Sequence, residues 1–167
     1  AALTLAEQGF PVDLVERSAE LGGALLHLHY GLEEFGIEAA LPPKGSDKFL
    51  GPQDYLQKLV TKIEDHPSIS VHFNAEIVNA QGFMGNFNST IGYSDREERI
   101  EVSHGATVVC VGGVEYRGEE YAYGTDDRIT TQQQFESTLA GFEKDGGALP
   151  NNIVMIQCVG PADKYCG

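Results

Sequence analysis

The order of elements at the start of the chain constrains the fold more than any other feature of the sequence. Residues 1–8 favour a helix, and Gly9 stands where a left-handed residue commonly ends one. A short run over 11–16 follows as a predicted strand, with an acidic residue at its carboxyl end. A helix that leads directly into such a strand is typical of the second half of a βαβ unit. The chain is therefore expected to have an α/β fold.

Glu16, at the end of this strand, is a candidate ligand-binding residue. In dinucleotide-binding βαβ units, a glycine-rich turn precedes the helix, and an acidic residue about 20 positions later accepts hydrogen bonds from ribose hydroxyls. Counting back from Glu16 places that turn before residue 1, so we expect the 167 residues to be a piece of a longer polypeptide. Spacing alone leaves two interpretations open. Glu16 either binds a ribose diol or is an acidic residue at a solvated strand end.

The apolar periodicity along the rest of the chain predicts further helices and strands. Residues 51–65 show the stripe of an amphipathic helix, and 132–142 predict a second one with Thr130 or Thr131 as its cap. The period is two from about 68 to 102, which predicts an antiparallel meander of short strands. Continuous apolar runs over 106–111 and 152–156 predict two buried parallel strands.

Composition excludes several classes of function. The chain has 25 acidic and 11 basic residues, a net charge of −14, whereas nonspecific nucleic-acid binding needs a cationic surface. No apolar run approaches the roughly 20 residues of a membrane span, and the 167 residues do not show the basic-then-apolar pattern of a signal peptide. The three cysteines are too few for a disulfide scaffold, so a reduced, cytoplasmic setting is expected.

Two glycine pairs are further candidate contacts for a cofactor. Gly22-Gly23 and Gly112-Gly113 could bring bare backbone close to a ligand, because glycine has no Cβ. Taken alone, an ordinary turn is the simpler interpretation of the first pair. Their order along the chain, with the acidic strand end, the meander and an apolar strand, suggests a flavoprotein that binds two dinucleotides. No side chain stands out as a general acid, base or nucleophile.

Several short stretches carry a more specific resemblance. They are 2–17 with 21–23, 51–56, 74–78, 82–87, 111–116, 129–132 and, most specific of all, 154–160. Together they resemble the FAD-binding region of HdrA, the iron–sulfur flavoprotein subunit of heterodisulfide reductase, over essentially the whole chain. The resemblance implies an FAD/NAD(P)-binding Rossmann-like fold of the glutathione-reductase type with an antiparallel β-meander.

The resemblance also implies which residues contact FAD. Glu16 would hold the adenosine ribose with Arg17 beside it, and Ile77 with its neighbouring backbone would face the adenine. Gly22 and Gly23 would line the pyrophosphate and ribityl region of the cofactor. Gly112 and Gly113 would close over the cofactor. The family usually has Ala-Thr before the second pair, where this chain has Cys110-Val111, so a hydroxyl contribution is not expected there.

The resemblance also extends to two of the three cysteines. Cys158 and Cys166 match the first two cysteine positions of a [4Fe-4S] cluster site in this family. Four thiolates hold such a cluster, so these two cysteines alone cannot assemble one. Without the resemblance, ordinary free thiols would be the simpler interpretation. Cys110 lies within an apolar run and is expected to be a buried packing residue.

The implied function is to relay electrons between FAD and [4Fe-4S] clusters, together with other subunits of a heterodisulfide-reductase-like complex in anaerobic energy metabolism. The expected divisions are an FAD-binding segment over 1–113, a connecting segment over 114–150, and the start of a following region over 151–167. One alternative is an NAD(P)H-dependent relative of the pyridine-nucleotide–disulfide oxidoreductases, although no glycine-rich fingerprint follows 152–156. The other alternative is a cofactor-free scaffold or docking domain.

Overall fold

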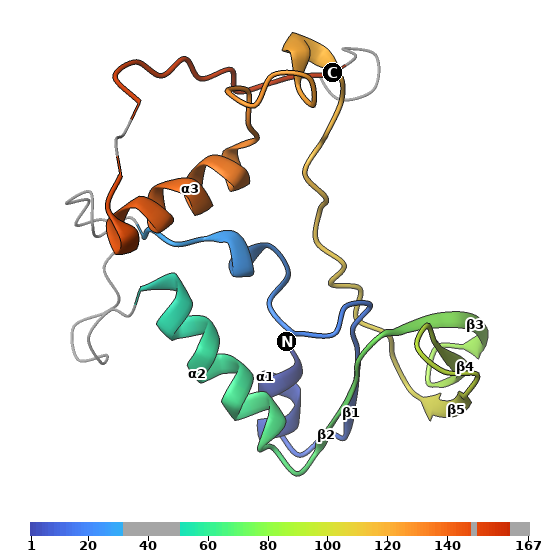
Figure 1. Cartoon of the computed structure of the whole chain (residues 1–167). Coiled ribbons are helices and arrows are strands. Elements are labelled where there is room, and N and C mark those ends of the chain that lie inside the picture. The colour runs from blue at the N-terminus through green and yellow to red at the C-terminus, as the bar shows by residue number, and fades with distance from the viewer. Residues whose placement is uncertain (32–50, 148–149, 161–167) are drawn as a thin grey trace. The chain divides into compact units, whose positions relative to one another are not determined.

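The computed structural model describes residues 1–31, 51–147 and 150–160 (Figure 1). The chain divides into two compact units. The first contains residues 1–23 and 54–111, and the second contains the described parts of 24–53 and 112–167. None of the helices in these described ranges is long and apolar enough to cross a membrane.

The first unit holds most of the regular structure. Its helices and strands, in chain order, are α1 (Ala2–Glu7), β1 (Val12–Val15), α2 (Pro52–Glu64), β2 (Ile69–His72), β3 (Ala75–Phe83), β4 (Asn86–Tyr93) and β5 (Arg99–His104). The predicted opening helix, its glycine and the following strand are confirmed. Gly9 follows α1 with a φ of +90°, and Ala6 of α1 is 4% exposed.

β1 and β2 form a two-stranded parallel sheet (Figure 1). Val12 lies opposite Ile69, and Val15 lies opposite His72. The prediction that residues 69–72 belong to the antiparallel meander is therefore wrong. Parallel strands need a long crossover connection, usually a helix, and α2 directly precedes β2 in this position. The structure therefore has a mixed α/β architecture with a small parallel sheet.

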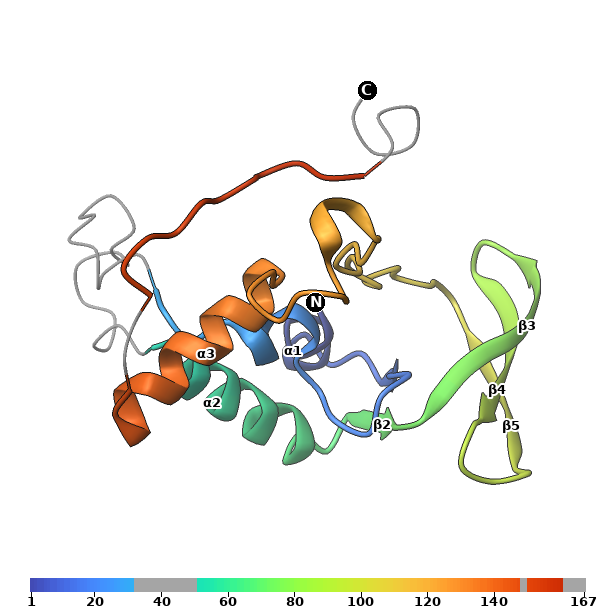
Figure 2. The same cartoon turned by 45° about the horizontal axis from the view of Figure 1, so that its top comes forward.

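The remaining strands of the first unit form the predicted meander (Figure 2). The sheet order is β3-β4-β5, with antiparallel pairing throughout and an irregularity in β3 between Ile77 and Asn79. Ile91 of β4 is 2% exposed and Ala75 at the start of β3 is 1% exposed. Since Ala75 lies three residues after the end of β2, the two sheets are joined by a short, fixed turn.

The second unit contains short elements and one longer helix. They are η1 (Gly23–His27), η4 (Glu120–Ala122) and α3 (Gln132–Asp145). Thr131 caps α3 in a reciprocal capping box with Gln134, which confirms one of the two predicted caps. The Glu136 carboxylate on α3 accepts hydrogen bonds from the backbone N–H groups of His29, at 2.7 Å, and Tyr30, at 3.1 Å.

Two predicted strands do not form. Residues 106–111 and 152–156 have no strand structure, and Val111 and Val154 are 88% and 89% exposed. Buried parallel strands need paired neighbours and covered faces, whereas the parallel sheet of the described residues contains β1 and β2 alone. Cys110 is exposed for the same reason, so its expected role as a buried packing residue is also wrong.

Candidate functional site

The carboxyl ends of β1 and β2 lie at the same edge of the parallel sheet, which is where ligands bind in α/β folds. Glu16 directly follows β1 at this edge. Its backbone N–H donates to the carbonyl oxygen of His72 at 2.9 Å, and its own carbonyl accepts from the N–H of Ala75 at 2.9 Å. The backbone of Glu16 is therefore held on both sides by β2 and the start of β3.

The side chain of Glu16 is held by Ser18. Oε1 of Glu16 accepts hydrogen bonds from the Ser18 N–H at 2.8 Å and from the Ser18 hydroxyl at 2.6 Å. A carboxylate oxygen has two lone pairs, so these two bonds saturate Oε1. Within the described residues, no hydrogen bond occupies Oε2. Ser18 is not among the predicted site residues, and its one local signal is its position two residues after Glu16.

Asn74 connects the end of β1 with the turn between β4 and β5. Its φ of +51° is left-handed, a conformation that asparagine tolerates better than most residues. The Asn74 N–H donates to the Ser18 carbonyl at 3.0 Å, and the Asn74 carbonyl accepts from the Ser94 N–H at 2.7 Å. The Asn74 side-chain amide donates to Asp95 at 3.3 Å. The turn that carries Glu16 is thus part of a connected backbone network.

A second connection runs through the imidazole of His72. Nε2 of His72 lies 2.8 Å from an Asp13 carboxylate oxygen, and Nδ1 lies 2.8 Å from the Tyr93 hydroxyl. An ionised carboxylate can only accept, so Nε2 carries a proton, and in the neutral form of the ring Nδ1 accepts from the Tyr93 hydroxyl. The Arg96 guanidinium lies 3.5 Å from the centre of the Tyr93 ring. These contacts tie β1, β2 and β4 together beside Glu16.

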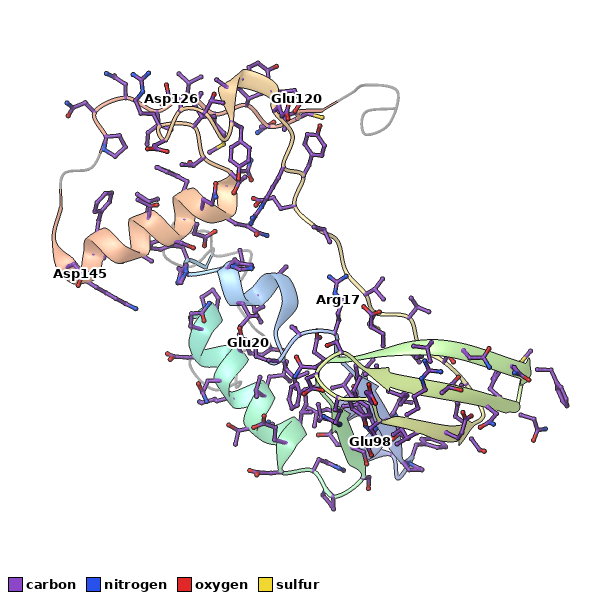
Figure 3. The ribbon with its side chains drawn as sticks, turned by 45° about the vertical axis from the view of Figure 1, so that its right-hand side comes forward. Arg17, Glu20, Glu98, Glu120, Asp126 and Asp145 are labelled. Carbon is purple, nitrogen blue, oxygen red and sulfur yellow. The ribbon has the colours of Figure 1, made fainter. Side chains whose placement is uncertain are left out.

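Arg17 and Glu98, both labelled in Figure 3, line a hollow of about 810 Å³ on the first unit. Glu16 is not among the residues that line it. The hollow is bounded by Glu76 and Val78 of β3 and by residues 92–99. Its three arginines are accompanied by four carboxylates, and Arg96 already contacts two of these. The mixed charge gives the hollow no strong preference for anions.

The other candidate residues of the first unit are Gly22, Gly23 and Ile77. The two glycines have consecutive positive φ values of +140° and +51°, a conformation that L residues rarely adopt. A Cβ at Gly23 would meet no atom within 4 Å, so the backbone is open on that side. Ile77 is 45% exposed on β3, between two residues that line the hollow. Because strand side chains alternate, we infer that Ile77 faces away from the hollow.

Comparison with known proteins shows what the chain is related to. No protein-family model matches it. The HdrA subunit of ferredoxin:CoB-CoM heterodisulfide reductase from Methanosarcina mazei is 22% identical to it, over 100% of this chain and 30% of that protein. The iron–sulfur subunit HdrA of CoB–CoM heterodisulfide reductase from Methanocaldococcus jannaschii is 30% identical, over 66% of this chain and 15% of that protein. The chain is a distant homologue of HdrA.

The resemblance that the sequence stretches indicated is therefore confirmed at the level of this relationship. This HdrA homologue spans about 30% of the length of the first curated relatives. An iron–sulfur HdrA subunit from Methanopyrus kandleri is 32% identical over 54% of this chain. The relatives are subunits of an oxidoreductase, which is the context in which the site must be interpreted.

In this HdrA homologue, the remaining candidate residues lie in the second unit or outside the described ranges. Gly112 and Gly113 belong to the second unit, and Gly112 has a φ of +63°. Cys158 lies in an exposed, irregular stretch, and Cys166 lies outside the described residues. No group of three or more His, Cys, Asp or Glu side chains in the described ranges could hold a metal ion. The described residues therefore do not fit a complete iron–sulfur cluster site.

Proposed function

We propose that the chain is the FAD-binding region of an oxidoreductase related to HdrA, and that Glu16 holds the adenosine ribose. The observation that supports this most is the position of Glu16 at the carboxyl end of β1, with its backbone held by β2 and β3 and with Oε2 accepting no hydrogen bond from the described residues. The Rossmann-like fold of the glutathione-reductase type is part of the proposal. The parallel pairing of β1 and β2, with α2 before β2, supports it.

The chemistry of Glu16 matches a ribose diol. The diol offers two hydroxyl donors, and Oε2 of an ionised carboxylate has two lone pairs that can accept both. Such charge-assisted hydrogen bonds are short and strong. The backbone at Gly22 and Gly23 would line the pyrophosphate, since both residues have a positive φ and a Cβ at Gly23 would meet no atom within 4 Å. Arg17, Ile77, Gly112 and Gly113 remain proposed contacts on the basis of the resemblance.

FAD, when bound, supplies the electron-transfer chemistry, and the side chains of this chain bind and orient it. We assign no acid, base or nucleophile to the described residues. In the whole protein, electrons would pass between FAD and [4Fe-4S] clusters within a complex with other subunits, in a cytoplasmic setting. Cys158 and Cys166 are proposed as two of the four thiolate ligands of one cluster. Cys158 is disulfide-bonded in the structure, so this role requires reduction of that bond. Domain divisions at 113 and 150 belong to the same proposal.

The test uses the full natural polypeptide that carries this chain, purified and reconstituted with FAD. We expect an oxidised flavin absorbance band at about 450 nm and tight FAD binding. Glu16→Gln should raise the Kd for FAD about 10- to 100-fold, because it weakens hydrogen bonds to a charged acceptor. Glu20→Gln is the matched control, since this exposed side chain has no assigned contact with the ligand.

Two results would overturn the proposal. The first is a reconstituted wild-type protein without flavin, which is the outcome expected of a cofactor-free scaffold. The second is an affinity for FAD that Glu16→Gln and Glu20→Gln leave equally unchanged, which would place the ribose elsewhere. If the purified protein binds NAD(P)H tightly and does not bind FAD, the pyridine-nucleotide alternative is favoured.

A further inference from the structure

We infer that Ser18 is a positioning residue that orients the Glu16 carboxylate for the ribose diol; this inference rests on the proposed function. The Ser18 hydroxyl and N–H both donate to the same oxygen, Oε1, at 2.6 and 2.8 Å. The result is an asymmetric carboxylate, in which Oε1 is saturated and Oε2 accepts no hydrogen bond within the described residues. Nothing in the resemblance assigned a role to Ser18.

The hydroxyl of Ser18 has a choice of two acceptors. Its oxygen lies 2.6 Å from Oε1 of Glu16 and 3.0 Å from the carbonyl oxygen of Glu20. A hydroxyl has one hydrogen to donate, so it serves one acceptor at a time. The shorter distance and the negative charge favour the carboxylate of Glu16. The Glu20 carbonyl then becomes the alternative acceptor when Glu16 is replaced.

Ser18 is itself held independently of Glu16. The Ser18 carbonyl accepts from the N–H of Asn74 at 3.0 Å, and Asn74 is tied in turn to Ser94. The neighbouring amide, that of Ala75, donates to the Glu16 carbonyl. The backbone N–H groups of Asn74 and Ala75 therefore hold the residues on either side of Arg17. The backbone of Ser18 is thus fixed, and its N–H and hydroxyl can orient the Glu16 carboxylate.

Loss of the hydroxyl should weaken binding by releasing the carboxylate. The last torsion of a glutamate side chain is broad, and only the bonds to Ser18 select one orientation here. In a Ser18→Ala protein the carboxylate would rotate more freely, and the ligand would have to order it on binding. We expect a roughly 3- to 10-fold higher Kd for FAD, smaller than the effect of Glu16→Gln because the Ser18 N–H still donates.

A double-mutant cycle in the full natural polypeptide tests this inference. The FAD affinity of wild type, Ser18→Ala, Glu16→Ala and the double variant is measured by flavin fluorescence titration, together with the thermal unfolding of each apoprotein. We expect Ser18→Ala to weaken binding in the wild-type background and to have no further effect when Glu16 is absent. Ser18→Thr, which retains the hydroxyl, should restore affinity to within about twofold of wild type.

The outcomes separate the positioning role from the proposed function. If Ser18→Ala leaves affinity unchanged while Glu16→Ala weakens it, Ser18 does not position Glu16 but the proposed function stands. If Ser18→Ala weakens binding equally in both backgrounds, it acts through the fold and the inference is overturned. If Glu16→Ala has no effect, the proposed ribose site itself is wrong. Ser18→Cys, which keeps the volume but donates weakly, replaces Ser18→Ala if that variant does not fold.

Discussion

Removal of the Tyr93 hydroxyl should destabilise the first unit by about 1–2 kcal/mol. The hydroxyl donates to Nδ1 of His72 at 2.8 Å, and such a hydrogen bond contributes a net 0.5–1.5 kcal/mol, roughly. The His72 side chain is 14% exposed, so the unpaired Nδ1 of the variant would be poorly solvated and would add to the cost. Tyr93→Phe keeps the aromatic ring on which Arg96 lies, so the change isolates the hydroxyl.

The assay is equilibrium unfolding in urea, with Tyr55→Phe as the control. Tyr55 is 53% exposed on α2, so its variant should stay within about 0.5 kcal/mol of wild type. Combining Tyr93→Phe with His72→Ala should give a sum that is less than additive by about 1 kcal/mol, because both changes remove the same bond. Equal stabilities for the two Tyr→Phe variants, or strict additivity with His72→Ala, would refute the role of this bond.

Three further expectations concern other parts of the structure. Gly82→Ala should lower the free energy of unfolding in urea by about 3 kcal/mol or more, because Gly82 has a φ of +111° and the new Cβ would collide with a β4 carbonyl oxygen. Gly85→Ala should lower it by about 1 kcal/mol, because Gly85 has a φ of +88° and open space around the new Cβ. Thr131→Ala should remove about 1 kcal/mol through loss of the α3 cap, measured by circular dichroism. Hydrogen bonds from Arg128 lower the pKa of Asp126 to about 2. Its stabilising effect should therefore be complete above its ordinary pKa of 3.8 and be lost as the pH falls through 2, and Arg128→Gln should raise the NMR titration midpoint.

Local sequence signals predicted the elements of the first unit well, but they could not predict how strands pair. A period of two marks residues 69–72 as a strand and is equally consistent with a parallel or an antiparallel neighbour. Its true partner, β1, lies more than 50 residues earlier in the chain. The same limit applies to the contact between Asn74 and Ser18, which depends on a turn conformation that no local pattern specifies.

The apolar runs over 106–111 and 152–156 show a different limit. Their composition is that of buried strands, and composition reports the preference of a segment for apolar surroundings. Whether the segment forms a strand is decided by the edge that pairs with it and by the layers that cover it. In the described residues these runs have neither, and Val109 remains 75% exposed.

Glu16 and Arg17 show why a site cannot be transferred from distant relatives by sequence position alone. The resemblance implies that Glu16 holds the ribose and that Arg17 lies beside it. Successive side chains of an extended segment point to opposite sides. In the structure, Glu16 is held by Ser18, whereas Arg17 lines a hollow with four carboxylates. At 22% identity the relationship indicates the class of protein, and the orientation of each side chain has to be established from its own contacts.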